Sequence, residues 1–281
     1  MNTIDFSMWF LYRVNIWLLV WISMIWWFAY YQNILNPANM PLYNLSNGSK
    51  EVRFQTMSHI WSQTFYDGVK KDIEIAKKDG FILFYEWVQP WSEENLKEFN
   101  EAIWIEFSPD LYKNFSKLYW VDHQRNPEFF WILNNEDYNI DLDINTIMSI
   151  YREKTWSTDI ENTKRWEQQV ADISRDVIDQ LSNLSEKELA VMRYVNKSVL
   201  NFIIKNAGVR NKIVEISGNQ DLFSVILDER DAHLAENILS SEASNIFVMY
   251  GMMHFDGVYR LLKEQDSKWE IKSIDEKQLI Y

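Results

Sequence analysis

The sequence predicts an α/β fold, with a mixed central sheet and flanking helices, plus one N-terminal transmembrane helix. Two observations lead to this fold class. Short apolar runs that end at glycine or polar residues alternate with longer stretches of helical periodicity, as in strands that helices connect. Ahead of them lies an apolar stretch in which no charged residue occurs between Arg13 and Lys50.

The composition narrows the class of protein. The chain has 281 residues, of which 47% are hydrophobic, and this allows one sizeable core domain and an appendage. Its net charge of -13 argues against a nucleic-acid partner, because phosphate binding needs a basic face. It contains no cysteine, so disulfides, cysteine-ligated metals and thiol nucleophiles are excluded.

The apolar stretch is the candidate membrane anchor. Residues 16–31 contain one polar residue, Ser23, and with their apolar flanks they approach the roughly 20 residues that cross a bilayer. Residues 1–36 are therefore predicted to be an N-terminal segment in which residues 14–35 form an uncleaved transmembrane helix. A cleaved signal peptide is disfavoured because no small-residue cleavage site follows. A buried core helix is the other alternative.

The flanks of this helix lead to two further predictions. Arg13 is the basic residue next to it, so the positive-inside rule places the amino terminus in the cytoplasm and the C-terminal domain on the extracytoplasmic side of the membrane. Residues 37–50 contain proline, asparagine, serine and glycine without periodicity, and they are predicted to be a linker. The folded α/β domain then covers residues 51–281.

The first half of that domain begins with a strand, a helix and a strand. These cover residues 51–55, 63–78 and 80–86, and the length of the connection suits a parallel crossover. Further helices are expected over residues 93–105 and 109–120 and from residue 144 onward.

The second half carries the longest helical patterns, over residues 160–181 and 185–206. Ser185 and Glu188 form a capping box at the start of the latter, and Gly208 is predicted to be the cap at its C-terminal end. The remaining elements are a helix over 232–239, a buried strand over 246–249, a helix over 258–265 and a strand over 269–274.

Three predicted strands end next to residues that can do chemistry. His59 follows the first strand, Glu86 ends the second, and His254 follows the buried strand after Gly251, which would let the backbone turn sharply. The carboxyl ends of strands line the ligand crevice of open α/β sheets. Two histidines and a carboxylate are also a common ligand set for a divalent metal that keeps an open position for water.

Other candidates rank lower. His123 lacks a neighbouring strand-and-glycine pattern, so a surface or structural role is preferred. His233 is expected on a helix face with Glu236, a spacing that occurs often by chance. Asp141 and Asp143 suit either a metal site or the cap of the helix that begins near residue 144, and the cap is the preferred interpretation.

Five short motifs together resemble the TraB/GumN family, which includes the TIKI-type proteases and is more distantly similar to the erythromycin-esterase (EreA) and ChaN-like folds. The motifs are MSHI at 57–60, FYE at 84–86, DLD at 141–143, ERDAHLAENI at 229–238 and GMMHFDG at 251–257. The resemblance implies an EreA/ChaN-like sheet and places Arg230 in the site. One departure is Thr56, which stands three residues before His59 where the GxxH motif has glycine.

The predicted function is a membrane-anchored, metal-dependent hydrolase. In this hypothesis His59, Glu86 and His254 bind a divalent metal ion or act beside it, and the metal activates a water molecule. Glu86 and Arg230 are the predicted catalytic residues, and Arg230 stabilises the oxyanion. A peptide substrate is implied by the TIKI resemblance alone, and a small molecule is the other possibility.

Two alternatives stay open. A metal-free hydrolase would use one of the histidines as a general base with Glu86 orienting it, as the erythromycin-esterase resemblance implies. A protein without catalytic activity would bind a peptide signal or haem in the same pocket, in line with the pheromone-shutdown role associated with TraB relatives.

The balance of tryptophan and glycine is abnormal. The chain has 14 tryptophans and 7 glycines, whereas glycine alone makes up about 7% of an average protein. Trp61, Trp87 and Trp91 stand at positions where glycine fits better, and Trp120 stands where the TraB/GumN family that the chain resembles often has glycine. We hypothesise that the gene comes from a lineage that reads the UGA codon as glycine, and that it was translated with a code in which UGA means tryptophan. The alternative is a protein that is rich in tryptophan.

This hypothesis predicts UGA codons at Trp61, Trp87 and Trp91. Sequencing the gene tests the codons, and peptide masses from the native organism test whether glycine is inserted there. UGG codons at these three positions would contradict the hypothesis.

Overall fold

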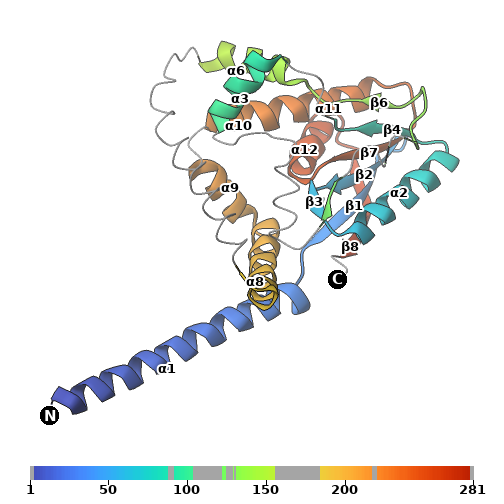
Figure 1. The fold of residues 1–281 in the computed structure, drawn as a ribbon. Helices are drawn as coiled ribbons and strands as arrows, with labels where there is room; N and C mark the ends of the chain where they lie inside the picture. Colours follow the sequence, from blue (N-terminus) through green and yellow to red (C-terminus); the bar gives the residue numbers. More distant parts are fainter. Residues whose placement is uncertain are drawn as a thin grey trace.

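The computed structural model describes residues 3–87, 92–103, 122–124, 129, 131–155, 184–216 and 220–278. A six-stranded mixed sheet forms the centre of the chain, in the order β6-β4-β7-β2-β1-β8 (Figure 1). This confirms the predicted α/β class with a mixed sheet. The strands are β1 (Asn39–Ser46), β2 (Glu51–Met57), β4 (Ile82–Tyr85), β6 (Tyr138–Asn139), β7 (Asn245–Gly251) and β8 (Glu270–Gln278).

Four neighbouring strands run parallel and bring their carboxyl ends to one edge. β7 pairs with β2 on one side and with β4 on the other, and β4 pairs with β6. Met57 at the end of β2 lies opposite Gly251 at the end of β7. β1 and β8 add an antiparallel half beyond β2. The segments that follow β2, β4 and β7 therefore meet at the same edge of the sheet.

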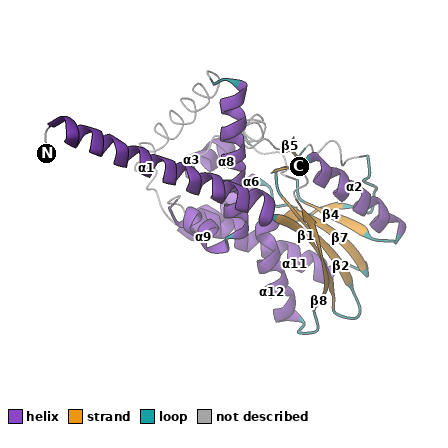
Figure 2. Cartoon of the chain, turned by 90° about the horizontal axis from the view of Figure 1, so that it is seen from below, coloured by secondary structure: helices purple, strands orange, loops and turns teal. Residues whose placement is uncertain are grey.

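Helices cover both faces of the sheet (Figure 2). On one face lies α2 (Gln63–Lys78), which Ser62 caps by accepting a hydrogen bond from the Phe65 N–H at 3.3 Å. On the other face lie α11 (Arg230–Ser240) and α12 (Phe255–Gln265). Because β7 is buried on both sides, its sequence is a continuous apolar run rather than an alternating one.

A third apolar cluster joins α3 (Glu93–Ile103), α6 (Ile144–Thr155) and α10 (Gln220–Ser224), around Met148 and Leu222. The remaining elements beside the sheet are the short strands β3 (Ile60–Trp61) and β5 (Asp122–His123), the π-helical turn η2 (Val225–Glu229) and the 3-10 turn η3 (Met252–His254). His123, expected to be a surface or structural residue, thus pairs with β3.

The predicted linker over residues 37–50 is wrong, because β1 lies there and pairs with both β2 and β8. Its proline and asparagines indicated a loop, but Met40, Leu42 and Leu45 are buried in the core between them. The apolar side chains of β1 therefore contribute more to its placement than its turn-forming residues do.

The helix boundaries in the second half were predicted in part. Ser185 and Glu188 form the predicted capping box of α8 (Glu186–Lys205). Gly208 does not cap this helix: α8 ends at Asn206, and Gly208 lies inside the next helix, α9 (Ala207–Ile216). The helices predicted over 109–120 and 160–181 lie outside the described residues.

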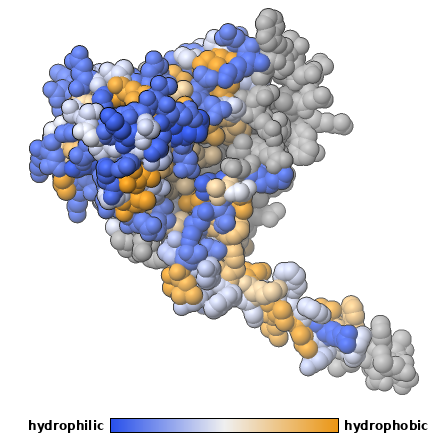
Figure 3. Space-filling view, turned by 180° about the vertical axis from the view of Figure 1, so that it is seen from behind, coloured by the Kyte–Doolittle hydropathy of each residue, from blue (hydrophilic) through white to orange (hydrophobic). Residues whose placement is uncertain are grey.

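The N-terminal helix projects from the domain. α1 (Thr3–Tyr30) continues into the π-helical turn η1 (Tyr31–Leu35), and the stretch Trp9–Leu35 is long and apolar enough to cross a membrane. Its apolar side chains lie on the outside, as Figure 3 shows for the projecting arm. A buried core helix, the alternative considered for this stretch, is therefore not what the structure contains.

Trp61 bears on the codon hypothesis. The side chain is fully buried next to Phe65, and its indole N–H has no hydrogen-bond partner. Buried tryptophans usually find a partner for this group. Trp269 has the same unsatisfied donor, and the ring of Trp61 fills part of the core, so the codon hypothesis stays a prediction.

Candidate active site

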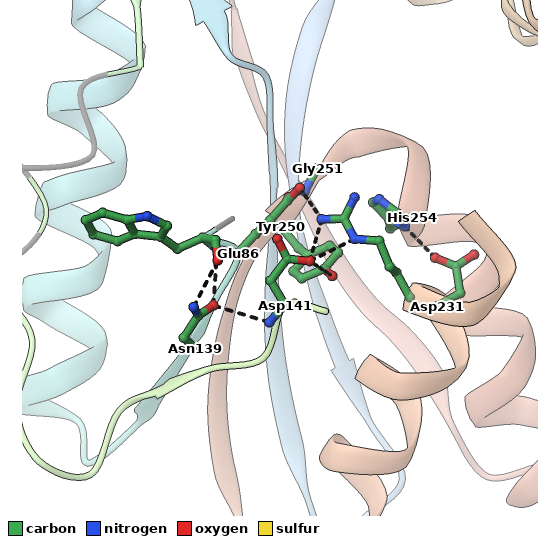
Figure 4. Close-up of polar contacts among 9 residues, drawn as sticks. Glu86, Asn139, Asp141, Asp231, Tyr250, Gly251 and His254 are labelled. Carbon is green, nitrogen blue, oxygen red and sulfur yellow. Dashed lines mark hydrogen bonds and ion pairs between the residues drawn. The ribbon is translucent and has the colours of Figure 1, made fainter. Parts of the chain in front are cut away.

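The three residues predicted at strand ends lie at the same edge of the sheet. His59 follows β2, Glu86 follows β4, and His254 ends η3 directly after β7. Since β4, β7 and β2 are parallel neighbours, the tertiary structure brings together positions that are far apart in the sequence. Figure 4 shows the side chains of Glu86 and His254 near the end of β7.

The carboxylate of Glu86 is held from two sides. Its Oε2 accepts a hydrogen bond from the Gly251 N–H at 2.6 Å, and its Oε1 lies 2.5 Å from Nη2 of Arg230. Burial by itself would raise the pKa of Glu86, but the charge of Arg230, helped by His254 and His59, lowers it to about 2. Glu86 is therefore ionised at neutral pH.

Arg230 shares its guanidinium between two carboxylates. Besides Glu86, it binds Oδ1 of Asp141 through Nε at 2.8 Å and through Nη2 at 2.7 Å. Asp141 also accepts a hydrogen bond from the Tyr250 hydroxyl at 3.2 Å. Burial raises the pKa of Asp141 to about 6, although Arg230 opposes this. One guanidinium cannot neutralise both carboxylates, so the cluster is negative at neutral pH.

His254 forms a second buried pair. Its Nδ1 lies 2.7 Å from Oδ1 of Asp231, and both side chains are almost fully buried. Burial raises the pKa of Asp231, and the hydrogen bond from His254 opposes this. A carboxylate on Nδ1 selects the tautomer with the proton on that nitrogen, which leaves Nε2 of the neutral ring as the basic atom.

Gly251 makes room for this arrangement. A Cβ on Gly251 would lie 3.2 Å from Oε2 of Glu86 and 3.3 Å from Cδ2 of His254, so the two side chains approach the same point. The φ of Gly251 is -52°, which any residue adopts. The predicted role in a sharp turn is therefore wrong, and glycine is needed because side chains come close to the backbone.

Gly257 makes room for Asp231 in the same way. A Cβ on Gly257 would lie 1.8 Å from Oδ2 of Asp231, well inside contact distance. Both glycines of GMMHFDG therefore leave space for carboxylates of the site.

His59 lies on the solvent side of the cluster. Its side chain is exposed to solvent. The protein around the imidazole nevertheless desolvates it and lowers its pKa; the charge of Glu86 raises the pKa, and that of Arg230 lowers it further. Thr56, the departure from the GxxH motif, is buried and donates a hydrogen bond to the Pro41 carbonyl at 2.7 Å. That position supports the pairing of β2 with β1 rather than the site.

The predicted metal ligands were tested against this geometry. Within the part of the chain that the structure describes, no three His, Asp or Glu side chains form a group that could hold a metal ion. The carboxylate of Glu86 is already bound by Arg230 and the Gly251 N–H. The three-ligand site of His59, Glu86 and His254 therefore stays a prediction from the residue types at the three strand ends.

Sequence reasoning missed several residues of the site. Asp231 and Tyr250 were not singled out, and Asp141 was interpreted as a helix cap. Asp143 is the cap of α6, since its Oδ1 accepts a hydrogen bond from the Thr146 N–H at 2.9 Å. A signal for Asp231 was available in Gly257, a helical glycine without a turn to explain it.

Two further polar residues, His233 and Asn139, make contacts of a structural kind. His233 contacts Asn237 on its own helix, with 3.4 Å between Nε2 and Nδ2. Asn139 holds the segment after Glu86, because its amide exchanges hydrogen bonds of 2.9 and 3.1 Å with the backbone of Trp87.

Comparisons of the chain with models of protein families, with curated proteins and with solved structures found no match. The chemistry of the site is therefore argued from its geometry and from the motifs of the sequence.

Replacing Gly257 tests the packing of the His254–Asp231 pair. We expect Gly257→Ala to displace the Asp231 carboxylate and to lower the free energy of unfolding by about 1–3 kcal/mol, the usual range for overpacking. Gly208→Ala is the matched control, because Gly208 is also helical and nothing lies within 4 Å of its Cβ position. Thermal unfolding of the full chain in detergent measures both. Equal stability of Gly257→Ala and Gly208→Ala would contradict this account.

Asp141 makes the stability depend on pH. Because its pKa rises from 3.8 to about 6 on folding, its contribution to stability is present below pH 3.8 and is lost as the pH rises through about 6. Glu86 acts in the opposite sense, but its contribution is lost only as the pH falls from 4.5 toward about 2.

Between about pH 5 and 7, the stability advantage of the wild type over Asp141→Asn should therefore shrink as the pH rises. Thermal unfolding across this range measures it, and Asp143→Asn, which changes the cap of α6, should keep the wild-type slope. Parallel curves for the wild type and Asp141→Asn would exclude the assignment.

Proposed function

We propose that the protein is a membrane-anchored hydrolase of ester or amide bonds, in which His254 is the general base. The observation that carries this proposal is the buried Asp231–His254 pair beside an ionised Glu86 at the carboxyl edge of the sheet. A histidine with one nitrogen on a carboxylate and the other turned to the reaction is a recurrent catalytic arrangement.

The proposed reaction uses water as the nucleophile. Asp231 holds the proton on Nδ1 of His254, and Nε2 takes a proton from water as the water oxygen attacks the carbonyl carbon. The negative charge of Glu86 stabilises the imidazolium that forms. When the tetrahedral intermediate collapses, the same nitrogen returns the proton to the leaving alcohol or amine, so the enzyme ends in its starting state.

Arg230 has two roles in this proposal. Its Nε and Nη2 atoms hold Asp141 and Glu86 in place and keep Glu86 ionised. The two N–H groups on Nη1 are then the candidates for stabilising the oxyanion, the role that the resemblance implies for this residue.

The proposal also includes the membrane helix, and a metal-dependent version of the hydrolase is its alternative. The apolar helix Trp9–Leu35 supports a single-pass membrane protein, and Arg13 supports an extracytoplasmic domain. A divalent metal ion at His59, Glu86 and His254 is the version that two histidines and a carboxylate at the strand ends suggest. The two versions differ in their response to a chelator.

The test uses the full chain in nanodiscs with a panel of chromogenic esters and fluorogenic peptides. We expect His254→Gln to lower kcat/KM by roughly 10²–10⁴-fold, the usual contribution of a general base. Asp231→Asn should lower it as well, because the tautomer of His254 is no longer fixed. The matched control is His233→Gln, which changes a histidine on α11 outside the site and should keep full activity.

The chelator separates the outcomes. Activity that survives chelation and is lost in His254→Gln supports the metal-free hydrolase. Activity that chelation abolishes and a divalent metal restores would replace it with the metal-dependent version. Saturable binding of a peptide or haem without turnover of any probe would contradict both and support the binding protein.

A further inference from the structure

α8 crosses the C-terminal end of the membrane helix. Figures 1 and 2 show it running across α1 rather than along it. The rings of Phe28 and Phe202 meet edge to face with their centroids 5.7 Å apart. The side chain of Asn33 donates to the Tyr194 carbonyl at 2.8 Å and accepts from Nδ2 of Asn201 at 2.9 Å.

This junction is buried and polar. Asn33 and Asn201 are both fully buried, and Oδ1 of Asn201 also accepts a hydrogen bond from the Ala38 N–H at 3.1 Å. Lys205, near the end of α8, donates to the Asn36 carbonyl at 3.0 Å. Because these polar groups satisfy one another, α8 is fixed to the point where α1 ends.

The length of the membrane helix sets the depth of this point. The stretch Trp9–Leu35 has 27 residues. At about 1.5 Å per residue it is ~40 Å long, whereas the hydrocarbon core of a bilayer is ~30 Å thick. The last turns of the helix, with Asn33, therefore reach the headgroup region. Since α8 is bound there and runs across α1, it lies along the membrane surface.

Between its charged first turn, where Glu186, Lys187 and Glu188 are exposed, and Lys205 at its end, the exposed side chains of α8 are apolar. Val191, Met192 and Val199 are 45%, 37% and 40% exposed, and their spacing places them on one stripe of the helix. Its polar residues Ser198 and Asn201 are buried instead. Val191, Met192 and Val199 are therefore available for contact with lipid.

The charge of the same region is the opposite of that of the whole chain. Residues 186–216, which cover α8 and α9, contain six basic and three acidic residues, a net charge of +3 in a chain whose net charge is -13. The acidic residues are Glu186, Glu188 and Glu215. The basic ones are Lys187, Arg193, Lys197, Lys205, Arg210 and Lys212, of which Lys187, Lys205 and Lys212 are exposed and Lys197 is buried. Basic residues beside a membrane helix are attracted to anionic headgroups.

We propose that α8 and α9 lie on an anionic lipid bilayer beside α1. Val191, Met192 and Val199 insert between headgroups, and the exposed Lys205 and Lys212 contact lipid phosphates. The observation behind this is that exposed apolar side chains and a net positive charge coincide on the two helices that follow the end of α1 in space. The inference requires α1 to cross the membrane and is independent of the hydrolase.

The absence of cysteine makes a direct test simple, because single cysteines can be labelled with an environment-sensitive fluorophore. Val191→Cys, Met192→Cys and Val199→Cys would be compared in nanodiscs that contain brominated lipid. Ile75→Cys on α2 is the matched control, since Ile75 is exposed and apolar but distant from α1. Leu19→Cys reports separately whether α1 itself is inserted.

We expect blue-shifted, bromine-quenched emission from the three α8 labels and from Leu19→Cys, and neither from Ile75→Cys. Anionic lipid should strengthen the α8 signals relative to zwitterionic lipid. Lys212→Gln should weaken that difference, and Lys268→Gln, an exposed lysine outside α8 and α9, should not.

Quenching of Leu19→Cys together with water-like emission from the α8 labels would overturn the proposal. A blue shift that grows with protein concentration and is insensitive to bromine would assign the stripe to a second copy of the chain instead. Lack of quenching at Leu19→Cys would overturn the premise that α1 is inserted, and the proposal with it.

Discussion

The guanidinium of Arg230 is shared by two buried carboxylates that follow neighbouring strands of the sheet. Glu86 follows β4 and Asp141 follows β6, and both lie against Arg230 at the first position of α11. Removing one partner of such a buried cluster leaves an uncompensated charge, which typically costs about 3–5 kcal/mol. The same contacts therefore fix the position of α11 on the sheet and keep Glu86 ionised.

The geometry of a helix connects this cluster to the histidine. Arg230 and Asp231 are consecutive, so their side chains point in directions about 100° apart around α11. Arg230 turns to Glu86 and Asp141, while Asp231 turns to His254. Gly251 and Gly257 lack the side chains that would block these approaches. The first turn of α11 thus positions Arg230 and Asp231, and Gly251 and Gly257 leave room for Glu86, Asp231 and His254.

The apolar N-terminal helix is joined directly to the sheet that carries this site. α1 and η1 lead directly into β1, which is an interior strand of the sheet, and α8 is bound to the same junction. The domain is therefore attached to the apolar helix through the sheet itself rather than through a linker. The basic residues of α8 and α9 lie on the C-terminal side of α1, and they oppose the orientation that Arg13 predicts.

The sequence by itself determined those features that depend on neighbouring residues. An alternating pattern predicted β2, apolar runs predicted β4 and β7, a capping box predicted the start of α8, and the positions of His59, Glu86 and His254 after three strands predicted that they lie at one edge of the sheet. These succeed because periodicity and capping act within a few residues, and because parallel strands bring their carboxyl ends to one edge.

Only the tertiary structure decided the features that depend on distant partners. From its own residues β1 was interpreted as a linker, and only its pairing with β2 and β8 shows that it is a strand. Asp141 was interpreted as a helix cap, and only its contact with Arg230, 89 residues later, places it in the site. Asp231 becomes a partner of His254 only when α11 packs beside η3. Burial and charge compensation between remote segments set these roles, and local sequence carries little information about either.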